Sequence, residues 1–123
     1  MTIKKHINGQ WSARLIEMLE SPAYRALSLS GHRLLSRIGI EHAHHGGNDN
    51  GKLPVTFDDF EAFGISHKSV APAIREAVAL GFATITQQGR PSESDFGRHP
   101  NYFQLNYLAF RRGSRWCEAT DVA

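Results

Sequence analysis

The sequence predicts one mainly helical α+β domain. Apolar residues recur at helical spacing in residues 11–45 and 56–80, whereas residues 82–107 contain two short runs of β-branched or alternating residues typical of strands. A chain of 123 residues is long enough for one hydrophobic core and too short for two independent ones. We therefore expect a flexible arm over residues 1–10, a single domain over residues 11–109 and a flexible tail over residues 110–123.

The composition excludes several classes of protein. The 14 lysines and arginines exceed the 12 acidic residues by only two, which allows nucleic acid as a partner without requiring it. Cys117 is the single cysteine, so neither an internal disulfide nor a cysteine-based zinc site is expected. No apolar run is long enough for a membrane span or a secretory signal, and we expect a cytoplasmic protein that does not contact the membrane.

The N-terminal part is expected to be helical. Ser21-Pro22 can end one helix and begin the next, because proline suits the first position of a helix. Ser30 is the expected N-cap of a long second helix, which must stop at His45-Gly46-Gly47. The apolar stripes of the two long segments are Leu15, Ile16, Met18 and Leu19, and Leu34, Leu35, Ile38 and Ile40.

Residues 52–64 predict a short strand followed by a short helix. Pro54 has no N–H to donate, so the segment Lys52–Thr56 suits the edge of a sheet. Thr56 is an expected N-cap, and the acidic residues directly after it favour the start of a helix. Gly64 is expected to end this helix.

The segment after Gly64 predicts the most informative helix. If Ser66 is its N-cap, Pro72 lies inside the helix and removes the hydrogen bond to the carbonyl of Lys68. If Ser69 is the N-cap, Pro72 falls in the first turn, where its missing N–H costs nothing. We favour an irregular first turn, and both alternatives stay open at this point. The expected inward residues are Val70, Ile74, Ala77 and Val78, and Gly81 is the expected end.

Two strands are expected after this helix. Phe82–Thr86 is rich in β-branched residues, Tyr102–Tyr107 alternates between apolar and polar residues, and a polar loop over Gln87–Pro100 joins them. A helix, a turn, a second helix and a two-stranded wing in this order form a winged helix-turn-helix.

Residues 53–108 resemble the winged helix-turn-helix family of DNA-binding proteins. The stretch Val70–Phe82 resembles the recognition helix and the start of the wing. Residues 34–108 are similar to small bacterial winged-helix proteins and to the DNA-binding modules of plasmid and phage replication initiators. Pro72 departs from the family pattern, which usually has a helix former at this position.

The resemblance implies sequence-specific binding of double-stranded DNA, with the recognition helix in the major groove and the wing on the minor groove. Such a protein would be a transcriptional regulator or an accessory factor of a plasmid or phage element, associated with the nucleoid when bound to DNA. No cofactor and no enzymatic activity are expected, since the chain has no phosphate-binding glycine loop and no nucleophile elbow.

The outward side of the predicted recognition helix carries the candidate DNA contacts. Lys68 and Arg75 can donate hydrogen bonds to guanine or phosphate, and His67 can donate or accept. The smaller candidates are Ala71, which can contact a thymine methyl group, and Ser66 and Ser69, which leave room for a phosphate near the backbone. The alternative interpretation is a solvated helix face, with Glu76 beside Arg75.

The predicted wing adds a second set of candidates. Arg90 or Arg98 can enter a narrow minor groove, whose negative potential favours a cation. Glu93 and Asp95 in the same loop would be repelled by phosphates, so the alternative is a loop closed by its own ion pairs.

A protein–protein interaction module without DNA binding is the alternative function. A homodimer is possible through the N-terminal helices, where four residues could pack across a two-fold axis: Trp11, Leu15, Leu19 and Tyr24. Separately, His42, His45 and Asp49 have a spacing at which they could share a metal ion, but histidines at a helix end are more often solvated, and we expect no metal. Arg33 and Arg37 are expected to pair with Glu41 rather than with the DNA backbone.

Overall fold

The computed structural model describes residues 9–91, 98–112 and 115–117, with the backbone alone for the short strands at 90–91, 98–99, 110–112 and 115–117. Its helices are α1 (Ile16–Glu20), α2 (Pro22–Ala26), α3 (Leu29–His44), α4 (Phe57–Ala62) and α5 (His67–Ala79). Its strands are β1 (Leu53–Val55), β2 (Ala83–Gln87), β3 (Arg90–Pro91), β4 (Arg98–His99), β5 (Asn101–Leu105), β6 (Phe110–Arg112) and β7 (Arg115–Cys117). Residues 1–8 of the expected arm lie outside the described residues.

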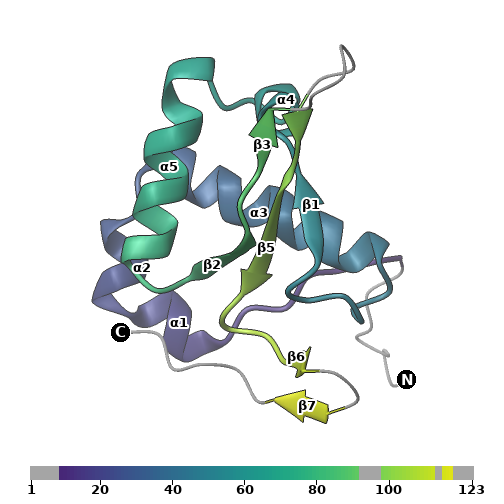
Figure 1. The fold of residues 1–123 in the computed structure, drawn as a ribbon. Helices are drawn as coiled ribbons and strands as arrows, with labels where there is room; N and C mark the ends of the chain where they lie inside the picture. The colour runs from purple at the N-terminus through teal and green to yellow at the C-terminus, as the bar shows by residue number, and fades with distance from the viewer. Residues whose placement is uncertain (1–8, 92–97, 113–114, 118–123) are drawn as a thin grey trace.

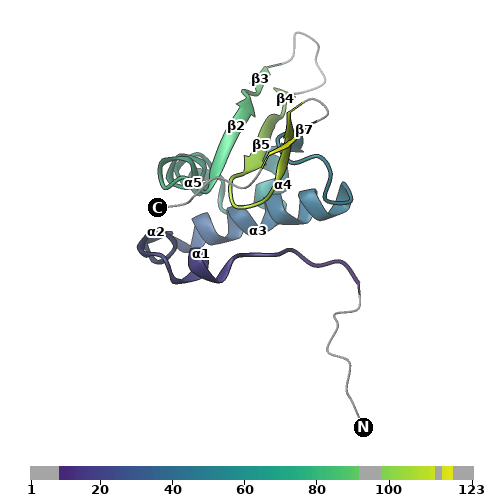
Figure 2. The same ribbon diagram turned by 90° about the horizontal axis from the view of Figure 1, so that it is seen from below.

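Helices cover one face of a small antiparallel sheet. The strand order is β1-β5-β2, with Leu53 opposite Phe103 and Ala83 opposite Leu105. α3 and α5 contact each other, and both contact the sheet (Figure 1). The segment before α1 runs along α3 on the side away from the sheet (Figure 2). The predicted mainly helical α+β class is therefore confirmed.

The core fills the space between this sheet and the helices. The ring of Phe60 meets the edge of the Phe103 ring, with centroids 5.9 Å apart. Tyr107 is buried in the turn that follows β5, and burial raises the pKa of its hydroxyl to about 12. The side chains that are fully shielded from solvent include Leu34, Leu35, Ile38, Leu53, Phe60, Val70, Phe82, Phe103 and Leu105.

Several local predictions are confirmed. The Ser21 hydroxyl accepts a hydrogen bond from the Tyr24 N–H, and Pro22 is the first residue of α2. Thr56 and Asp59 form a reciprocal capping box at the start of α4, with bonds of 3.0 and 2.9 Å. β1 lies at the edge of the sheet, where a proline, which has no N–H to donate, is tolerated.

Other local predictions are wrong. The N-cap of α3 is Ser28, not Ser30, because the Ser28 hydroxyl accepts the Gly31 N–H at 3.1 Å. Residues 11–15 are not helical, and α1 begins only at Ile16. Val78 was expected inward but is 40% exposed, because the buried stripe of α5 is made by Val70, Ala73, Ile74 and Ala77, and Val78 lies at its edge.

The position of Pro72 distinguishes the two alternatives for the start of α5. The helix begins at His67 with Ser66 as N-cap, so Pro72 is interior and the carbonyl of Lys68 loses its helical partner. The alternative with Ser69 as N-cap is therefore wrong, but the first turn is irregular as predicted, since the Ser69 N–H donates to the Ser66 carbonyl at 2.8 Å in the i to i+3 pattern of a 3₁₀ turn. The Pro72 ring points to solvent, where it displaces no core side chain.

The two segments expected to lack regular structure both contain strands. β3 and β4 pair within the predicted loop, with Arg90 opposite His99, so part of this loop is an antiparallel ladder. β6 and β7 pair within the expected tail, with Arg112 opposite Arg115, so its first part is an antiparallel ladder. Among the helices that the structure describes, none combines the length and apolar composition needed to cross a membrane.

Candidate nucleic-acid interface

The turn between α4 and α5 is fixed against α3. Gly64 adopts φ = 99°, a conformation that favours glycine, and the Ile65 N–H donates to the Phe60 carbonyl at 3.1 Å. Arg33 Nη1 donates to the carbonyl of Gly64 at 2.9 Å. Arg33 and Arg37 were both expected to pair with Glu41, and only Arg37 does so, at 3.1 Å. Arg33 thus connects α3 to the turn that sets the direction of α5.

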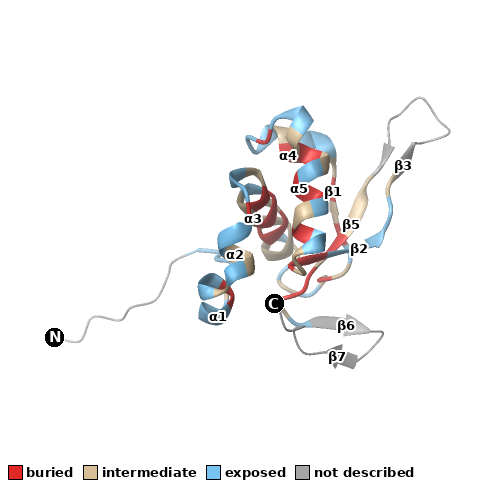
Figure 3. Cartoon of the chain, turned by 90° about the vertical axis from the view of Figure 1, so that its left-hand side faces the viewer, coloured by how far each residue is buried: buried red, intermediate tan, exposed pale blue. Residues whose placement is uncertain are grey.

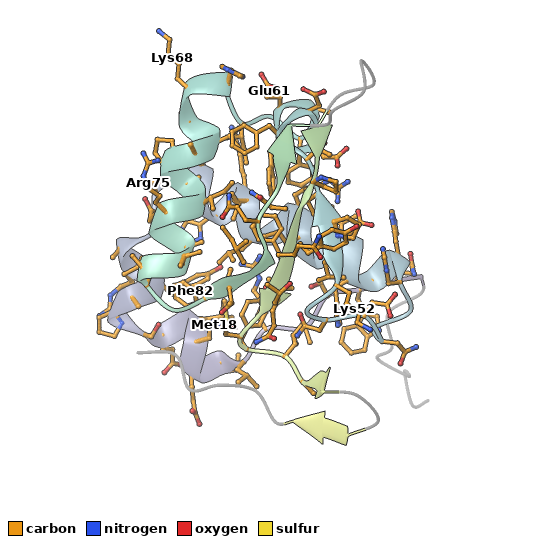
Figure 4. All side chains as sticks on the ribbon, viewed as in Figure 1. Met18, Lys52, Glu61, Lys68, Arg75 and Phe82 are labelled. Atoms are coloured by element: carbon orange, nitrogen blue, oxygen red, sulfur yellow. The ribbon has the colours of Figure 1, made fainter. Side chains whose placement is uncertain are left out.

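Lys68 and Arg75 lie on the outward side of α5. The buried stripe of this helix faces α3 and the sheet, while the opposite side is exposed (Figure 3). Both cationic side chains extend from that side (Figure 4). Pro72 and Ala79 are exposed beside them, and Ala71 is partly exposed. Among the described residues neither cation forms an ion pair, so both are available to an external anion.

The nearest acidic side chains have partners of their own. Glu76 Oε1 accepts the backbone N–H of Ser28 at 2.5 Å, which turns Glu76 toward the start of α3 and away from Arg75. At this position the negative charge of Glu76 is stabilised by the positive N-terminal end of the α3 dipole. Glu61 Oε1 lies 3.2 Å from His67 Nδ1, so His67 faces α4 in part. An external partner would have to compete with Glu61 for His67.

The two candidate serines bind each other. Ser66 is the N-cap by position, but its side chain caps no helix N–H; its hydroxyl donates to the Ser69 hydroxyl at 2.9 Å. Both side chains are small and lie at the start of α5, as the sequence predicts.

β3 and β4, in the segment predicted to form the wing, lie at the same end of the molecule as the start of α5 (Figure 1). Arg90 and Arg98 belong to β3 and β4, where Arg90 pairs with His99 and Arg98 with Pro91. The side chains of both arginines lie outside the described part, as do Glu93 and Asp95. Their predicted contacts with a minor groove stay predictions.

The histidine cluster at the end of α3 is an ion-pair network. His45 Nδ1 is 2.7 Å from Asp49 Oδ2, and His45 Nε2 is 2.8 Å from Glu41 Oε2. Burial is the main reason that the pKa of His42 is lowered, followed by its neighbour His45. Within the described residues no three His, Cys, Asp or Glu side chains are arranged to hold a metal ion.

The predicted dimer residues separate into two groups. Trp11, Leu15 and Leu19 are exposed. Tyr24, by contrast, packs inward, where its ring meets Phe82 edge-on and its hydroxyl accepts a hydrogen bond from Arg14 Nη1 at 2.7 Å. Tyr24 is partly buried and both its ring and its hydroxyl have partners within the chain, and its contact with a second chain stays a prediction.

Two residues that position α5 were missed by the sequence interpretation. Glu76 follows the buried Ala73 by three residues, a spacing that places it at the border of the buried stripe rather than beside Arg75. Arg33 gave no such signal, since its contact with Gly64 is made across 31 residues of sequence.

No protein family model, curated protein or solved structure matches this chain.

Proposed function

We propose that this chain is a winged-helix protein that binds double-stranded DNA, with α5 in the major groove and the β3–β4 wing at the adjacent minor groove. The observation that carries the proposal is the outward face of α5, where Lys68 and Arg75 are exposed and form no ion pair with a described residue. Such a protein would regulate transcription or assist a plasmid or phage element.

The order of the elements supports this proposal. α4, a turn and α5 are followed by β2 and its partner β5, which is the order of a helix-turn-helix with a wing. Lys68 is in the first turn of α5, the part of a recognition helix that reaches base edges, and Arg75 is two turns further along, where a phosphate is the more accessible partner. One duplex across the end shown at the top of Figure 1 would meet both the helix and the wing.

One observation favours the alternative of a protein-binding module. Phe57 and Phe63 at the two ends of α4 are each 37% exposed, and aromatic side chains are enriched in protein interfaces. The two functions differ in their response to salt. Phosphate contacts release counterions and weaken steeply as salt rises, whereas an apolar interface does not.

The test begins with selection of bound fragments from a pool of random duplexes, followed by titration of the selected duplex at several salt concentrations. Lys68→Ala and Arg75→Ala should each weaken binding, by about 1–3 kcal/mol where the side chain contacts a base edge. Where it contacts a phosphate, the slope of log K against log salt should fall by about 1 and all sequences should be affected alike.

Lys52→Ala is the matched control. Lys52 is an exposed lysine just before β1, at the opposite end of the molecule from Lys68 (Figure 4), and its removal should leave affinity unchanged. Equal losses in all three variants would mean that binding follows net charge and not the face of α5. No duplex binding at low salt would disprove the proposed function.

A further inference from the structure

The N-terminal helix α1 has apolar residues on both of its sides. Met18 is 3% exposed and anchors α1 to the core. The other side carries Leu15, Ile16 and Leu19, which are 54%, 66% and 37% exposed, and Trp11 before the helix is 63% exposed. We call these four residues the α1 surface. Glu17 and Glu20 lie on the same helix and are exposed. Large exposed apolar side chains with polar residues around them mark a candidate interaction site.

We infer that the α1 surface pairs with the same surface of a second copy of this chain, across a two-fold axis. The inference does not depend on DNA binding. A two-fold axis brings the same patch of both chains together, so a single apolar patch is sufficient to form both sides of the contact.

The size of the surface agrees with a dimer contact. The four side chains expose roughly 400 Å² of apolar surface, about the size of the largest apolar patch on a typical monomer, which is often functional. Two such surfaces face to face, with the flanking exposed residues of α1 and α2, reach about 1,000 Å², the lower limit for a specific protein interface. A contact of this size would give a reversible dimer and not an obligate one.

The charges at the edge of the surface suit a second copy. Glu17 and Glu20 on α1 are exposed, and so is Arg25 on α2. Since both signs occur at the same edge, an acidic residue of one chain can face Arg25 of the other across the axis. An edge of one sign would repel its own copy.

The neighbouring polar groups are already bound within the chain, so they do not oppose this pairing. Arg14 uses Nη1 for the Tyr24 hydroxyl and Nη2 for the Ser36 hydroxyl, at 2.7 and 3.0 Å. Its guanidinium is therefore directed inward, and covering the α1 surface does not strip Arg14 of its partners.

Sedimentation equilibrium of the full chain without nucleic acid tests the inference, with a reductant present to keep Cys117 from forming intermolecular disulfides. The wild type should pass from monomer to dimer as its concentration rises. Leu15→Glu and Ile16→Glu should each raise the dissociation constant at least tenfold, since each would place a charge in the centre of the contact. Unchanged circular dichroism would verify that both variants fold.

Phe57→Glu is the matched control. Phe57 and Ile16 are both exposed first residues of a helix, but α4 and α1 lie at opposite ends of the molecule in Figures 1 and 3. This variant should dimerise as the wild type does. A wild type that is monomeric at about 1 mM, one that forms open-ended higher oligomers, or a dimer insensitive to both α1 variants would overturn the inference. None of these results bears on whether a monomer binds DNA.

Discussion

His45 is held between two carboxylates at the end of α3. Asp49 Oδ2 lies 2.7 Å from one ring nitrogen and Glu41 Oε2 lies 2.8 Å from the other. Ionised carboxylates only accept hydrogen bonds, so both nitrogens must donate, which requires the protonated ring. The hydrogen bond to Asp49 and then that to Glu41 raise the pKa of His45 above its ordinary value of 6.5. Arg37 Nη1 donates to the other oxygen of Glu41, Oε1, at 3.1 Å.

This geometry predicts the pH dependence of stability above neutrality. A pKa raised in the folded state stabilises the fold fully below the ordinary value, and this stabilisation is lost as pH rises through the folded pKa. Urea unfolding at fixed ionic strength should therefore give a free energy that falls as pH rises above about 6.5 in the wild type. His45→Gln should be less stable at the lower pH and should lack this fall.

The neighbouring histidines define the limits of that experiment. The pKa of His42 is lowered. The contribution of His42 to the free energy of unfolding is therefore complete above about pH 6.5 and is lost only as pH falls below that value, outside the range of this experiment. His44→Gln is the control, because His44 is exposed near the end of α3 and should leave the wild-type pH profile intact. Parallel curves for the wild type and His45→Gln would show that His45 is not protonated in this site.

At the scale of the elements, α5 keeps an interior proline that weakens it. Pro72→Ala restores a hydrogen bond to the Lys68 carbonyl and should raise the free energy of unfolding by about 1–3 kcal/mol. This value includes the opposing effect that alanine gives the unfolded chain more conformational freedom than proline does. Pro22→Ala at the first position of α2 should be neutral or slightly destabilising. Urea midpoints of the two variants provide the comparison. A less stable Pro72→Ala protein would mean that the bend at Pro72 is needed for packing.

The elements that sequence predicts well are those with a local cause. The Thr56 cap, the Pro54 edge strand and the Ser21-Pro22 junction each depend on residues within three or four positions. The failures have non-local causes. Ser28 competes with Ser30 for the same helix start, and it has the further contact of its own N–H with Glu76, a residue 48 positions away.

The strands β3, β4, β6 and β7 were missed for a related reason. Each has only two or three residues, too few for an alternating pattern to be recognised. Their pairing depends on a partner strand brought alongside by the rest of the fold. The segment over residues 87–100, with two Gly, two Pro and two Ser, favours a loop when considered alone, and the last residues of a chain are commonly frayed.

At the scale of the whole molecule, the candidate interface was predictable only in part. The side of α5 that faces outward follows from helical spacing, and Lys68 and Arg75 are exposed as that spacing predicts. The side chains that fix the orientation of α5 could not be found in this way. Arg33 and Glu76 bind backbone groups of other elements, and such contacts exist only once the elements are packed.

Asn50 is a further side chain that binds backbone groups of distant elements. It is 4% exposed, in the turn between α3 and β1, and its side-chain oxygen accepts the N–H of Leu105 at 2.7 Å. Its amide nitrogen lies 2.8, 3.2 and 3.1 Å from the carbonyls of Leu105, Leu108 and Ala109. One side chain thus connects the turn after α3 to the end of β5 and to the approach to β6.

Removal of the Asn50 side chain and its hydrogen bonds should lower the stability of the whole fold. Asn50→Ala leaves a buried N–H and buried carbonyls without partners, which should lower the free energy of unfolding by about 2–4 kcal/mol. Asn48→Ala, in the same turn but exposed, should change it by less than about 0.5 kcal/mol. Urea denaturation followed by circular dichroism measures both, and hydrogen exchange of the Leu105 amide should accelerate in Asn50→Ala alone. Equal stability of the two variants would mean that water replaces the Asn50 side chain, and that the end of β5 is held by the sheet without it.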